Sequence, residues 1–327
     1  MASYLGIDVS KDQLDAVLLR EDGQRESGRF DNTRKGFNQL RHFLKKRGKG
    51  IVHVGLEATG HYGDEVALFL HEAGYLVSVI NPAQIKSYAD SQLRRTKTDA
   101  SDAAVIADFC RTQQPTPWQP PAPEVRELQA LMRHRGALLQ MRQQENNRLA
   151  SGQHSATVRH SIQEHVAFIT QQLDDLDRRI RQHLDQYPDL RRQRDLLTSI
   201  PGIGDVTAAQ LLAELPSWAA SASPRQIAAY AGLAPRQHIS GSSVRRPSRL
   251  SKRGSTRLRR ALYMPAISAK RYLPALHAFA QRLLDAGKPT MAVIAAVMRK
   301  LLLLAHAILK SGRPFDPNYA LHFTPTT

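Results

Sequence analysis

The sequence of 327 residues has a single cysteine, Cys110, and this scarcity excludes two kinds of site. One thiol can build neither a disulfide framework nor a cysteine-based metal site, so the chain fits a reducing cytoplasm. Long uninterrupted apolar runs are also missing. Arg299, Lys300 and His306 interrupt the most apolar tract, residues 291–309. We therefore expect a buried helix there and no membrane partner. The start, MASYLGID, has no basic segment followed by an apolar stretch, so nothing in it indicates secretion.

Acidic residues are few, because 29 Asp and Glu stand against 46 Lys and Arg, which gives a net charge of +17. Residues 215–284 contain thirteen Lys or Arg and no acid at all. A charge run is usually a solvated face, but this length without one acid favours contact with phosphate. The hydrophobic content of 42% allows sizeable cores and excludes a disordered chain. The composition predicts a folded protein with nucleic acid as its partner.

The first part of the chain, residues 1–111, has the pattern of an α/β domain. Five segments predict strands, at residues 4–9, 14–19, 26–31, 51–58 and 75–81. Residues 34–48 and 63–74 have helical spacing and end at glycine, and Pro82 begins more helix. A three-stranded meander followed by alternating helices and apolar strands predicts a ribonuclease H-like (RuvC-like) fold.

Three further segments follow. Five prolines in residues 112–123 predict an extended linker. Residues 124–190 predict a helical coiled-coil region, in which an earlier helix packs on the seam as a hairpin or across a subunit interface. The seam consists of Ile162, Val166, Ile169, Leu173, Leu176, Ile180 and Leu184. Residues 191–327 predict a third unit that is mostly α-helical.

Four carboxylates are candidate metal ligands. Asp8 and Glu57 end strands that are neighbours in this fold, and a helix beginning near Thr98 would bring Asp99 and Asp102 over the same edge. Oxygen ligands alone suit Mg²⁺ or Mn²⁺, and two such ions can assist phosphodiester cleavage. Each acid also has an ordinary interpretation. Asp8 could be a turn residue at a strand end, Glu57 could cap the following helix, and Asp99 and Asp102 could be acids that complement the dipole in the first turn of a helix. The triplet GID also begins phosphate loops of sugar kinases and actin-like ATPases, but no second glycine-rich phosphate loop follows.

The C-terminal unit contains two candidate nucleic-acid elements. In PGIG, Gly202 and Gly204 predict a helix-hairpin-helix turn whose backbone N–H groups bind phosphate, although an ordinary helix connection also explains it. In RQHISGSSV, the serines Ser240, Ser242 and Ser243 are candidate nucleophiles, although most such serines only donate hydrogen bonds to phosphate. The cations expected to contact phosphate are Arg236, Arg245, Arg246, Arg249, Lys252, Arg253 and Arg257.

These motifs together resemble a known family. The segments GIDVSKDQLD, EATGHY, VSVINPAQIKSYA, KTDASDA, IPGIG, YAGLAPRQHISGSSVRRPSRLSKRGSTRLRRALYMPA and KSGRPF are similar to the insertion-sequence family numbered one hundred and ten. The resemblance covers almost the whole chain. Family members are DEDD transposases guided by a bridge RNA, related to the Piv/MooV DNA invertases. Their four acids fall on Asp8, Glu57, Asp99 and Asp102, and their serine falls on Ser240, with Ser242 as a lesser possibility.

The resemblance implies a tetramer, arranged as a dimer of dimers, that recombines donor and target double-stranded DNA in the nucleoid. It also implies a structured non-coding RNA partner, a serine linked covalently to a DNA 5′-phosphate, and an active site completed by another subunit. Two alternatives from other classes stay open. A RuvC-like endonuclease would hydrolyse DNA junctions with water and form no covalent intermediate. A non-catalytic architectural protein would keep the basic face and tolerate loss of any acid.

Overall fold

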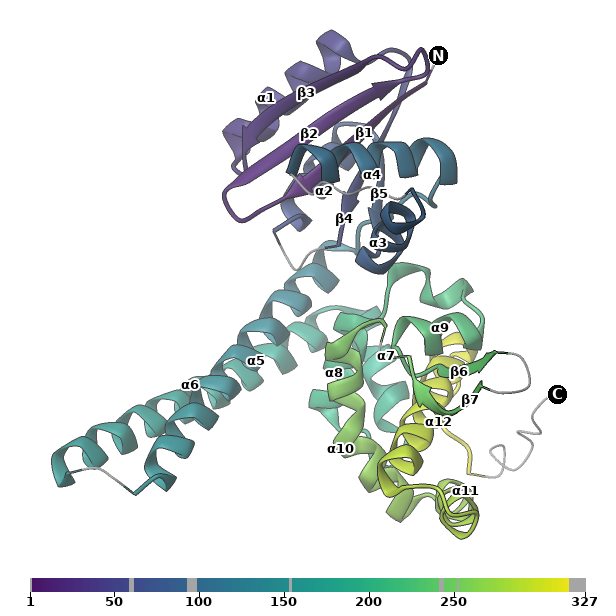
Figure 1. The fold of residues 1–327 in the computed structure, drawn as a ribbon. Coiled ribbons are helices and arrows are strands. Elements are labelled where there is room, and N and C mark those ends of the chain that lie inside the picture. Colours follow the sequence, from purple (N-terminus) through teal and green to yellow (C-terminus); the bar gives the residue numbers. More distant parts are fainter. Residues whose placement is uncertain are drawn as a thin grey trace. The chain divides into compact units, whose positions relative to one another are not determined.

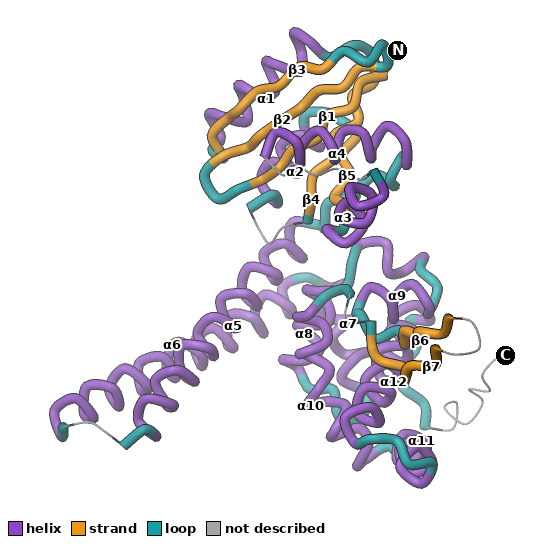
Figure 2. Tube along the Cα trace, in the orientation of Figure 1, coloured by secondary structure: helices purple, strands orange, loops and turns teal. Residues whose placement is uncertain are grey.

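The computed structural model describes residues 2–58, 62–92, 99–152, 155–240, 244–251 and 253–317. The chain forms two compact units, residues 1–120 and 121–327. Figure 2 shows strands in two places, a five-stranded sheet in the first unit and a two-stranded hairpin in the second.

The sheet of the first unit has the order β3-β2-β1-β4-β5. β1 pairs antiparallel with β2, which pairs antiparallel with β3, whereas β4 is parallel to β1 and β5 is parallel to β4. The strands are β1 (Ala2–Val9), β2 (Gln13–Arg20), β3 (Arg25–Asp31), β4 (Ile51–Glu57) and β5 (Leu76–Ile80). The predicted strands lie within one or two residues of these bounds, and the topology is the predicted ribonuclease H-like one.

Helices cover both faces of this sheet, as Figure 1 shows. They are α1 (Arg34–Arg47), α2 (Asp64–Glu72), α3 (Pro82–Ser91) and α4 (Asp99–Gln113). Because side chains alternate along a strand, β1 contributes side chains to the cores on both faces of the sheet. Leu5 packs in one core with Phe37 of α1 and Phe69 of α2, whereas Tyr4 packs in another with Ile106 of α4. Asp8 therefore belongs to the face that α4 covers.

The edge strand β5 is covered by the segment that follows α4. The backbone N–H of Trp118 donates to the carbonyl of Val77 at 2.7 Å. The Ser78 hydroxyl donates to the carbonyls of Pro115 and Thr116, each at 3.0 Å. This part of the predicted linker is docked on the first unit, so the boundary expected at residue 111 lies at residue 120 instead.

Buried His53 lies beneath this docked segment. Its Nε2 lies 2.9 Å from the Ser78 oxygen, and because the Ser78 proton goes to the two carbonyls, Nε2 is the donor. Its Nδ1 is buried with no hydrogen-bond partner among the described residues. A proton on Nδ1 would enter a dry site, and burial accordingly lowers the pKa of His53 below its usual 6.5.

We expect acid to destabilise the first unit through His53. Above pH 6.5 the imidazole is neutral in both the folded and unfolded states, so it adds no pH dependence. Below pH 6.5 the unfolded chain takes up a proton that the folded chain refuses, and stability falls by up to about 1.4 kcal/mol per pH unit until the folded pKa is reached. His53→Gln keeps a donor to Ser78, so its thermal unfolding should lose less stability between pH 7.5 and 5.5 than wild type. Equal losses would contradict this role.

The second unit begins with two long helices, α5 (Pro123–Ala150) and α6 (Ala156–Gln186), which run side by side (Figure 1). Six of the seven predicted seam residues are buried, and Val166 is half-buried. Arg135 of α5 and Asp177 of α6 form a two-bond ion pair across the helices, at 2.6 and 3.1 Å. Within one chain, the seam therefore faces α5 as a hairpin.

The remaining elements of the second unit share a core with the helical hairpin. They are α7 (Pro188–Thr198), α8 (Asp205–Glu214), the short 3₁₀ helix η1 (Ser217–Ser221), α9 (Pro224–Tyr230), β6 (Pro235–Ser240), β7 (Val244–Leu250), α10 (Thr256–Tyr272), α11 (Pro274–Asp285) and α12 (Thr290–Ser311). Because Leu128, Ile169 and Leu197 pack in the same core as Leu301, the boundary expected at residue 190 separates no compact unit.

Helix α12 contains the most apolar tract. By length and composition it is the one helix of the described chain that could cross a membrane. Its Leu301, Leu302 and Ala305 are fully buried in the core of the second unit. The tract is therefore a core helix, as predicted.

Candidate active site and nucleic-acid interface

Asp8 and Glu57 end neighbouring strands on the face of the sheet that α4 covers. In the parallel register of β1 and β4, Gly6 lies beside Gly55 and Ile7 beside Leu56. Continuing that register places Asp8 beside Glu57, with strands about 4.8 Å apart. Both acids are half-buried. The carboxyl edge of the sheet therefore presents two adjacent carboxylates.

Helix α4 reaches this edge because two glycines let it lie directly on the sheet. A Cβ on Gly6 would lie 2.0 Å from the backbone oxygen of Ala103 and 2.4 Å from the nitrogen of Ala107. A Cβ on Gly55 would lie 2.3 Å from Sγ of Cys110. Farther along α4, the Gln114 amide donates to the hydroxyl of Tyr4 at 3.1 Å. Helix α4 thus runs antiparallel to β1, and its first turn, with Asp99 and Asp102, lies toward Asp8.

A buried carboxylate holds α3 against α4. Asp108 accepts hydrogen bonds from Tyr88 at 2.8 Å, from Gln92 at 3.0 Å and from Arg111 at 2.8 and 3.1 Å. Burial alone would raise the pKa of Asp108, but these hydrogen bonds lower it to about 2. Because Gln92 ends α3, this cluster fixes one end of the connection that leads to Asp99.

Asn32 joins the two loops that follow β1 and β4. Its side-chain amide donates to the carbonyls of Ser10 at 3.0 Å, Lys11 at 3.3 Å and Tyr62 at 3.1 Å. Its backbone N–H donates to the carbonyl of Asp12 at 2.9 Å. Ser10 lies two residues after Asp8, and Tyr62 lies five residues after Glu57. Sequence reasoning missed this positioning residue, for which the turn-type FDNT after a strand was the available signal.

We expect Asn32→Asp to disturb the loops that follow Asp8 and Glu57, and so to lower strand cleavage, without unfolding the chain. The variant keeps the side-chain shape but sets a carboxylate against three carbonyl oxygens, so the two loops should separate. Strand cleavage should fall about tenfold, and the Mg²⁺ concentration for half-maximal cleavage should rise. Asn38→Ala is the control, because it removes one hydrogen bond, from the Asn38 side-chain amide to the carbonyl of Arg34, within α1. A loss of thermal stability with unchanged Mg²⁺ dependence would make Asn32 merely structural.

A further acid, Asp15, lies beside Asp8 and was missed because sequence alone does not give strand register. It is paired with Asp8 across β1 and β2, and its Oδ1 accepts from Nε of Arg29 at 2.8 Å. The side chain of Asp99 lies outside what the structure describes. Among the described residues, no three acidic, histidine or cysteine side chains form a group that could hold a metal ion. The predicted convergence of four carboxylates therefore stays a prediction.

In the second unit, the predicted helix-hairpin-helix turn joins α7 to α8. Gly202 has a positive φ of 100°, and a Cβ there would lie 2.9 Å from the backbone nitrogen of Ala269 in α10. The positive φ and the close packing are by themselves enough to require glycine at this position, whether or not the turn binds a ligand. Gly204 is exposed at the start of α8, and a Cβ there would have nothing within 4 Å. Of the two glycines Gly204 is the exposed one, and the phosphate contact expected at both stays a prediction.

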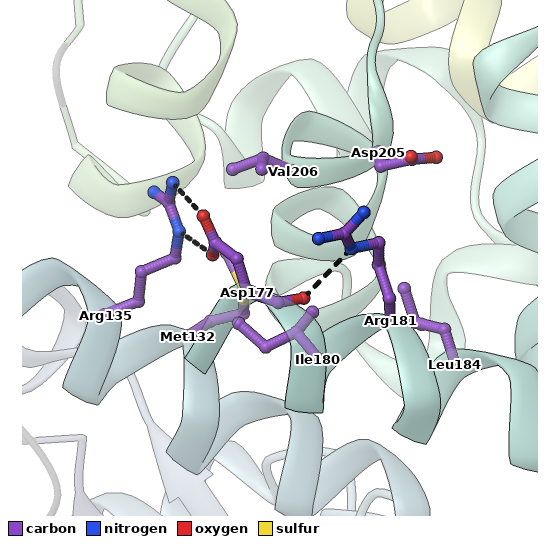
Figure 3. Close-up of a pocket in the computed structure, with 8 residues that line it drawn as sticks. All are labelled: Met132, Arg135, Asp177, Ile180, Arg181, Leu184, Asp205 and Val206. Carbon is purple, nitrogen blue, oxygen red and sulfur yellow. Dashed lines mark hydrogen bonds and ion pairs between the residues drawn. The ribbon is translucent and has the colours of Figure 1, made fainter. Parts of the chain in front are cut away.

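A cleft of about 190 Å³ lies beside the start of α8 (Figure 3). Its walls are Met132, Arg135, Asp177, Ile180, Arg181, Leu184, Asp205 and Val206. The Arg135 guanidinium points at Asp177, and Nε of Arg181 donates to the Asp177 carbonyl at 3.3 Å. Two arginines are balanced by two aspartates, so the cleft itself has no excess of positive charge for an anion.

The predicted nucleophile lies on a β-hairpin that sequence reasoning missed. Ser240 is the last residue of β6 and is paired with Val244, the first residue of β7. The register changes between Arg236 and His238, opposite Pro247, which has no N–H to donate. Arg236, Arg245, Arg246 and Arg249 lie on the two strands. The side chains of these arginines and of Ser240 lie outside the described residues, as do Lys252 and Ser242.

The start of α10, which follows this hairpin, is held by a half-buried acid, Glu214. The Ser255 hydroxyl donates to Glu214 at 3.4 Å, and Arg257 lies 3.7 Å from it. Burial raises the pKa of Glu214, an effect that the cations Arg257 and Arg133 oppose. Arg253 and Arg257, both predicted to bind phosphate, are exposed, but Glu214 offsets part of the charge of Arg257. The backbone N–H of Ser251 donates to the carbonyl of Ala234 at 3.0 Å and closes the hairpin.

Comparison with known proteins assigns both units to one family. Residues 5–152 match a family model described as a transposase, and residues 194–281 match one described as the transposase IS116/IS110/IS902 family. The pilin gene-inverting protein of Moraxella bovis is 34% identical over 318 residues, 96% of this chain and 98% of that protein. The transposase for insertion sequence element IS1328 of Yersinia enterocolitica is 26% identical over 292 residues, 80% of this chain and 81% of that protein. The chain therefore belongs to the IS110 family of transposases and is a DNA recombinase of that family.

Proposed function

We propose that the protein is an RNA-guided recombinase that cuts and rejoins donor and target DNA through a phosphoserine intermediate. The observation that carries the proposal is the pair Asp8 and Glu57 at the carboxyl edge of the sheet, toward which the first turn of α4 runs, in a chain of this transposase family. The acidic edge and the hairpin with Ser240 belong to different units of the chain.

The proposed reaction exchanges one phosphodiester for another. Oγ of Ser240 attacks the phosphorus, a Ser–O–P bond forms, and the bond to the 3′ oxygen breaks. The serine proton passes to a base, and the departing 3′ oxygen takes up a proton. In the reverse step a 3′ hydroxyl of the other DNA attacks the phosphoserine and releases Ser240. Because the number of phosphoester bonds is conserved, rejoining needs no energy-rich co-reactant.

Asp8, Glu57, Asp99 and Asp102 would hold Mg²⁺, with Mn²⁺ as a substitute, because their donor atoms are all carboxylate oxygens. When bound, such ions neutralise charge that develops on the phosphate oxygens. Arg236, Arg245, Arg246, Arg249, Lys252 and Arg253 would hold the DNA backbone, and Arg257 would contribute in part. Asn32 and Asp108 would keep the loops and α4 in position around the acids.

Guidance by a structured non-coding RNA is supported by the chain's charge and by the expectation that the PGIG turn and the acid-free basic stretch contact nucleic-acid backbones. A tetramer, as a dimer of dimers, would carry about four times the chain's charge of +17, which is costly to assemble without a polyanion. Backbone contacts alone cannot choose a target. Base pairing to bound RNA supplies that choice, while the protein recognises RNA shape.

A nicked suicide substrate tests the covalent step. The 3′ hydroxyl needed for rejoining is lost with a short fragment, so the wild-type protein should stay attached to a DNA 5′-phosphate. Mass spectrometry of the digested adduct should map the link to Ser240. A link at Ser242 would move the nucleophile, and cleavage that leaves only free ends would favour the RuvC-like endonuclease.

A further inference from the structure

Helix α10 has an exposed stripe that mixes cations with apolar side chains. The stripe consists of Arg260, Tyr263, Met264, Ile267 and Arg271. At about 100° per residue, these side chains fall within an arc of about 100°. The opposite arc holds the buried residues of the helix, Leu258, Leu262, Pro265, Ala266 and Ala269. The stripe is therefore the outer side of a helix whose inner side is packed in the core.

The apolar members of the stripe are unusually exposed. Met264 is 66% exposed, Ile267 38% and Tyr263 36%, and Tyr272 at the end of the helix is 65% exposed. These are four of the thirteen large apolar residues exposed in the described part of the chain. Scattered exposed apolar residues need no explanation, but a cluster rimmed by cations marks an interaction surface.

The charge around the stripe favours a polyanion over a second copy of the chain. Helix α10 lies within residues 215–284, which contain no acid. Arg260 and Arg271 form no ion pair among the residues that the structure describes. A second copy docked through the same face would bring these cations against each other, and like charges across an interface are costly.

The mixed chemistry of the stripe favours unpaired nucleotides over a duplex. In a duplex the flat faces of the bases are stacked on one another, so Tyr263 and Met264 would have only phosphates and groove edges to contact. In a single strand those faces are open, and aromatic side chains stack on them while arginines contact the backbone. Arg260 and Arg271 stand at the two ends of the stripe with the apolar side chains between them, an arrangement that suits such a strand.

We propose that the outer face of α10 binds a single-stranded DNA segment released during strand exchange. This inference rests on the proposed recombinase function. Ser255 caps α10 by accepting from the backbone N–H of Leu258 at 3.1 Å, only five residues after β7 ends. The face therefore begins at the base of the hairpin that carries Ser240. From Arg260 to Arg271 the stripe is about 17 Å long at 1.5 Å per residue, enough for a few nucleotides.

Equilibrium binding of fluorescent oligonucleotides to the full-length protein tests the proposal. The probes are one mixed-sequence DNA strand, the same strand in a duplex, and the RNA of the same sequence. Tyr263→Ala combined with Met264→Ser should weaken binding of single-stranded DNA about five- to tenfold and change duplex binding less than twofold. Arg260→Gln should lower the salt dependence of single-strand binding by about one counterion. Met291→Ser, at a 63% exposed methionine of α12, is the matched control.

Each other outcome overturns the proposal in its own way. Equal losses for strand and duplex would make the face a general backbone contact. A loss confined to RNA would assign the face to the guide. Unchanged binding with a changed oligomeric mass by light scattering would make it an interface between copies. Because binding needs no cleavage, failure here is distinguishable from failure of the phosphoserine mechanism.

Discussion

Asp8→Asn is expected to lower DNA strand cleavage by about a thousandfold while nucleic-acid binding stays within about twofold of wild type. The substitution keeps the shape of the side chain and removes the negative charge at the centre of the acidic edge. Asp8 is half-buried beside the register position of Glu57, so an uncharged amide there should leave the fold intact. Cleavage on a labelled duplex and binding by fluorescence anisotropy give the two measurements.

The matched control for Asp8 is Asp22→Asn. Asp22 lies in the turn between β2 and β3 and accepts one hydrogen bond from the backbone of Gln24 at 3.0 Å. Asp22→Asn makes the same change of charge at a position away from the acidic edge, so strand cleavage by this variant should match that of wild type. Asp15→Asn should have an intermediate effect, because Arg29 already pairs with that carboxylate. Full wild-type cleavage in EDTA would show that no divalent ion is needed and would refute the role given to all four acids.

Gly6→Ala is expected to lower the free energy of unfolding by more than about 3 kcal/mol and to abolish cleavage. The added methyl would meet the backbone of α4 at Ala103 and Ala107, and backbone atoms cannot rotate away. Helix α4 must then lift from the sheet and carry Asp102 away from Asp8. Urea unfolding measures the first effect, and the duplex cleavage assay measures the second.

Two comparisons make the Gly6 prediction specific. Gly136→Ala places the same methyl in open space on helix α5 and should stabilise the chain slightly. Gly55→Ala meets Sγ of Cys110, a side-chain atom, so adding Cys110→Ala should restore part of the lost stability. Gly6→Ala has no such partner to remove. An unfolding midpoint for Gly6→Ala equal to that of wild type would contradict the close seating of α4.

Sequence pattern predicted the first unit well because its strands carry their own signals. Runs such as YLGIDV and IVHVGLEA are buried along almost their whole length, as strands covered on both faces are, and their order fixes which strand ends are adjacent. Ser240 and its arginines were found as residues, but the hairpin beneath them was not predicted. Its strands, PRQHIS and VRRPSRL, are polar and contain proline, so β-propensity gives them no signal.

Other features depend on three-dimensional contacts that no local pattern encodes. Asn32 contacts Tyr62 thirty residues away, and Asp15 acquires its place beside Asp8 only through strand register. The docking of residues 115–118 depends on the hydrogen bonds that Ser78 donates to Pro115 and Thr116 and that Trp118 donates to Val77, whereas five prolines alone predict a free linker. Gly6 and Gly55 are visible in the sequence, but only the packing of α4 on the sheet shows that glycine is needed there for the helix to come so close to the strands.

The covered edge of β5 bears on how the first unit behaves when it is separated from the rest of the chain. An open edge strand offers unpaired backbone groups to other chains and promotes aggregation. A fragment ending at residue 111 would lose Pro115, Thr116 and Trp118, and would expose both the edge and the indole-covered surface near His71. A fragment ending at residue 120 retains its own cover. We therefore expect the proline-rich segment to protect the sheet against self-association, and the isolated first unit to need it for solubility.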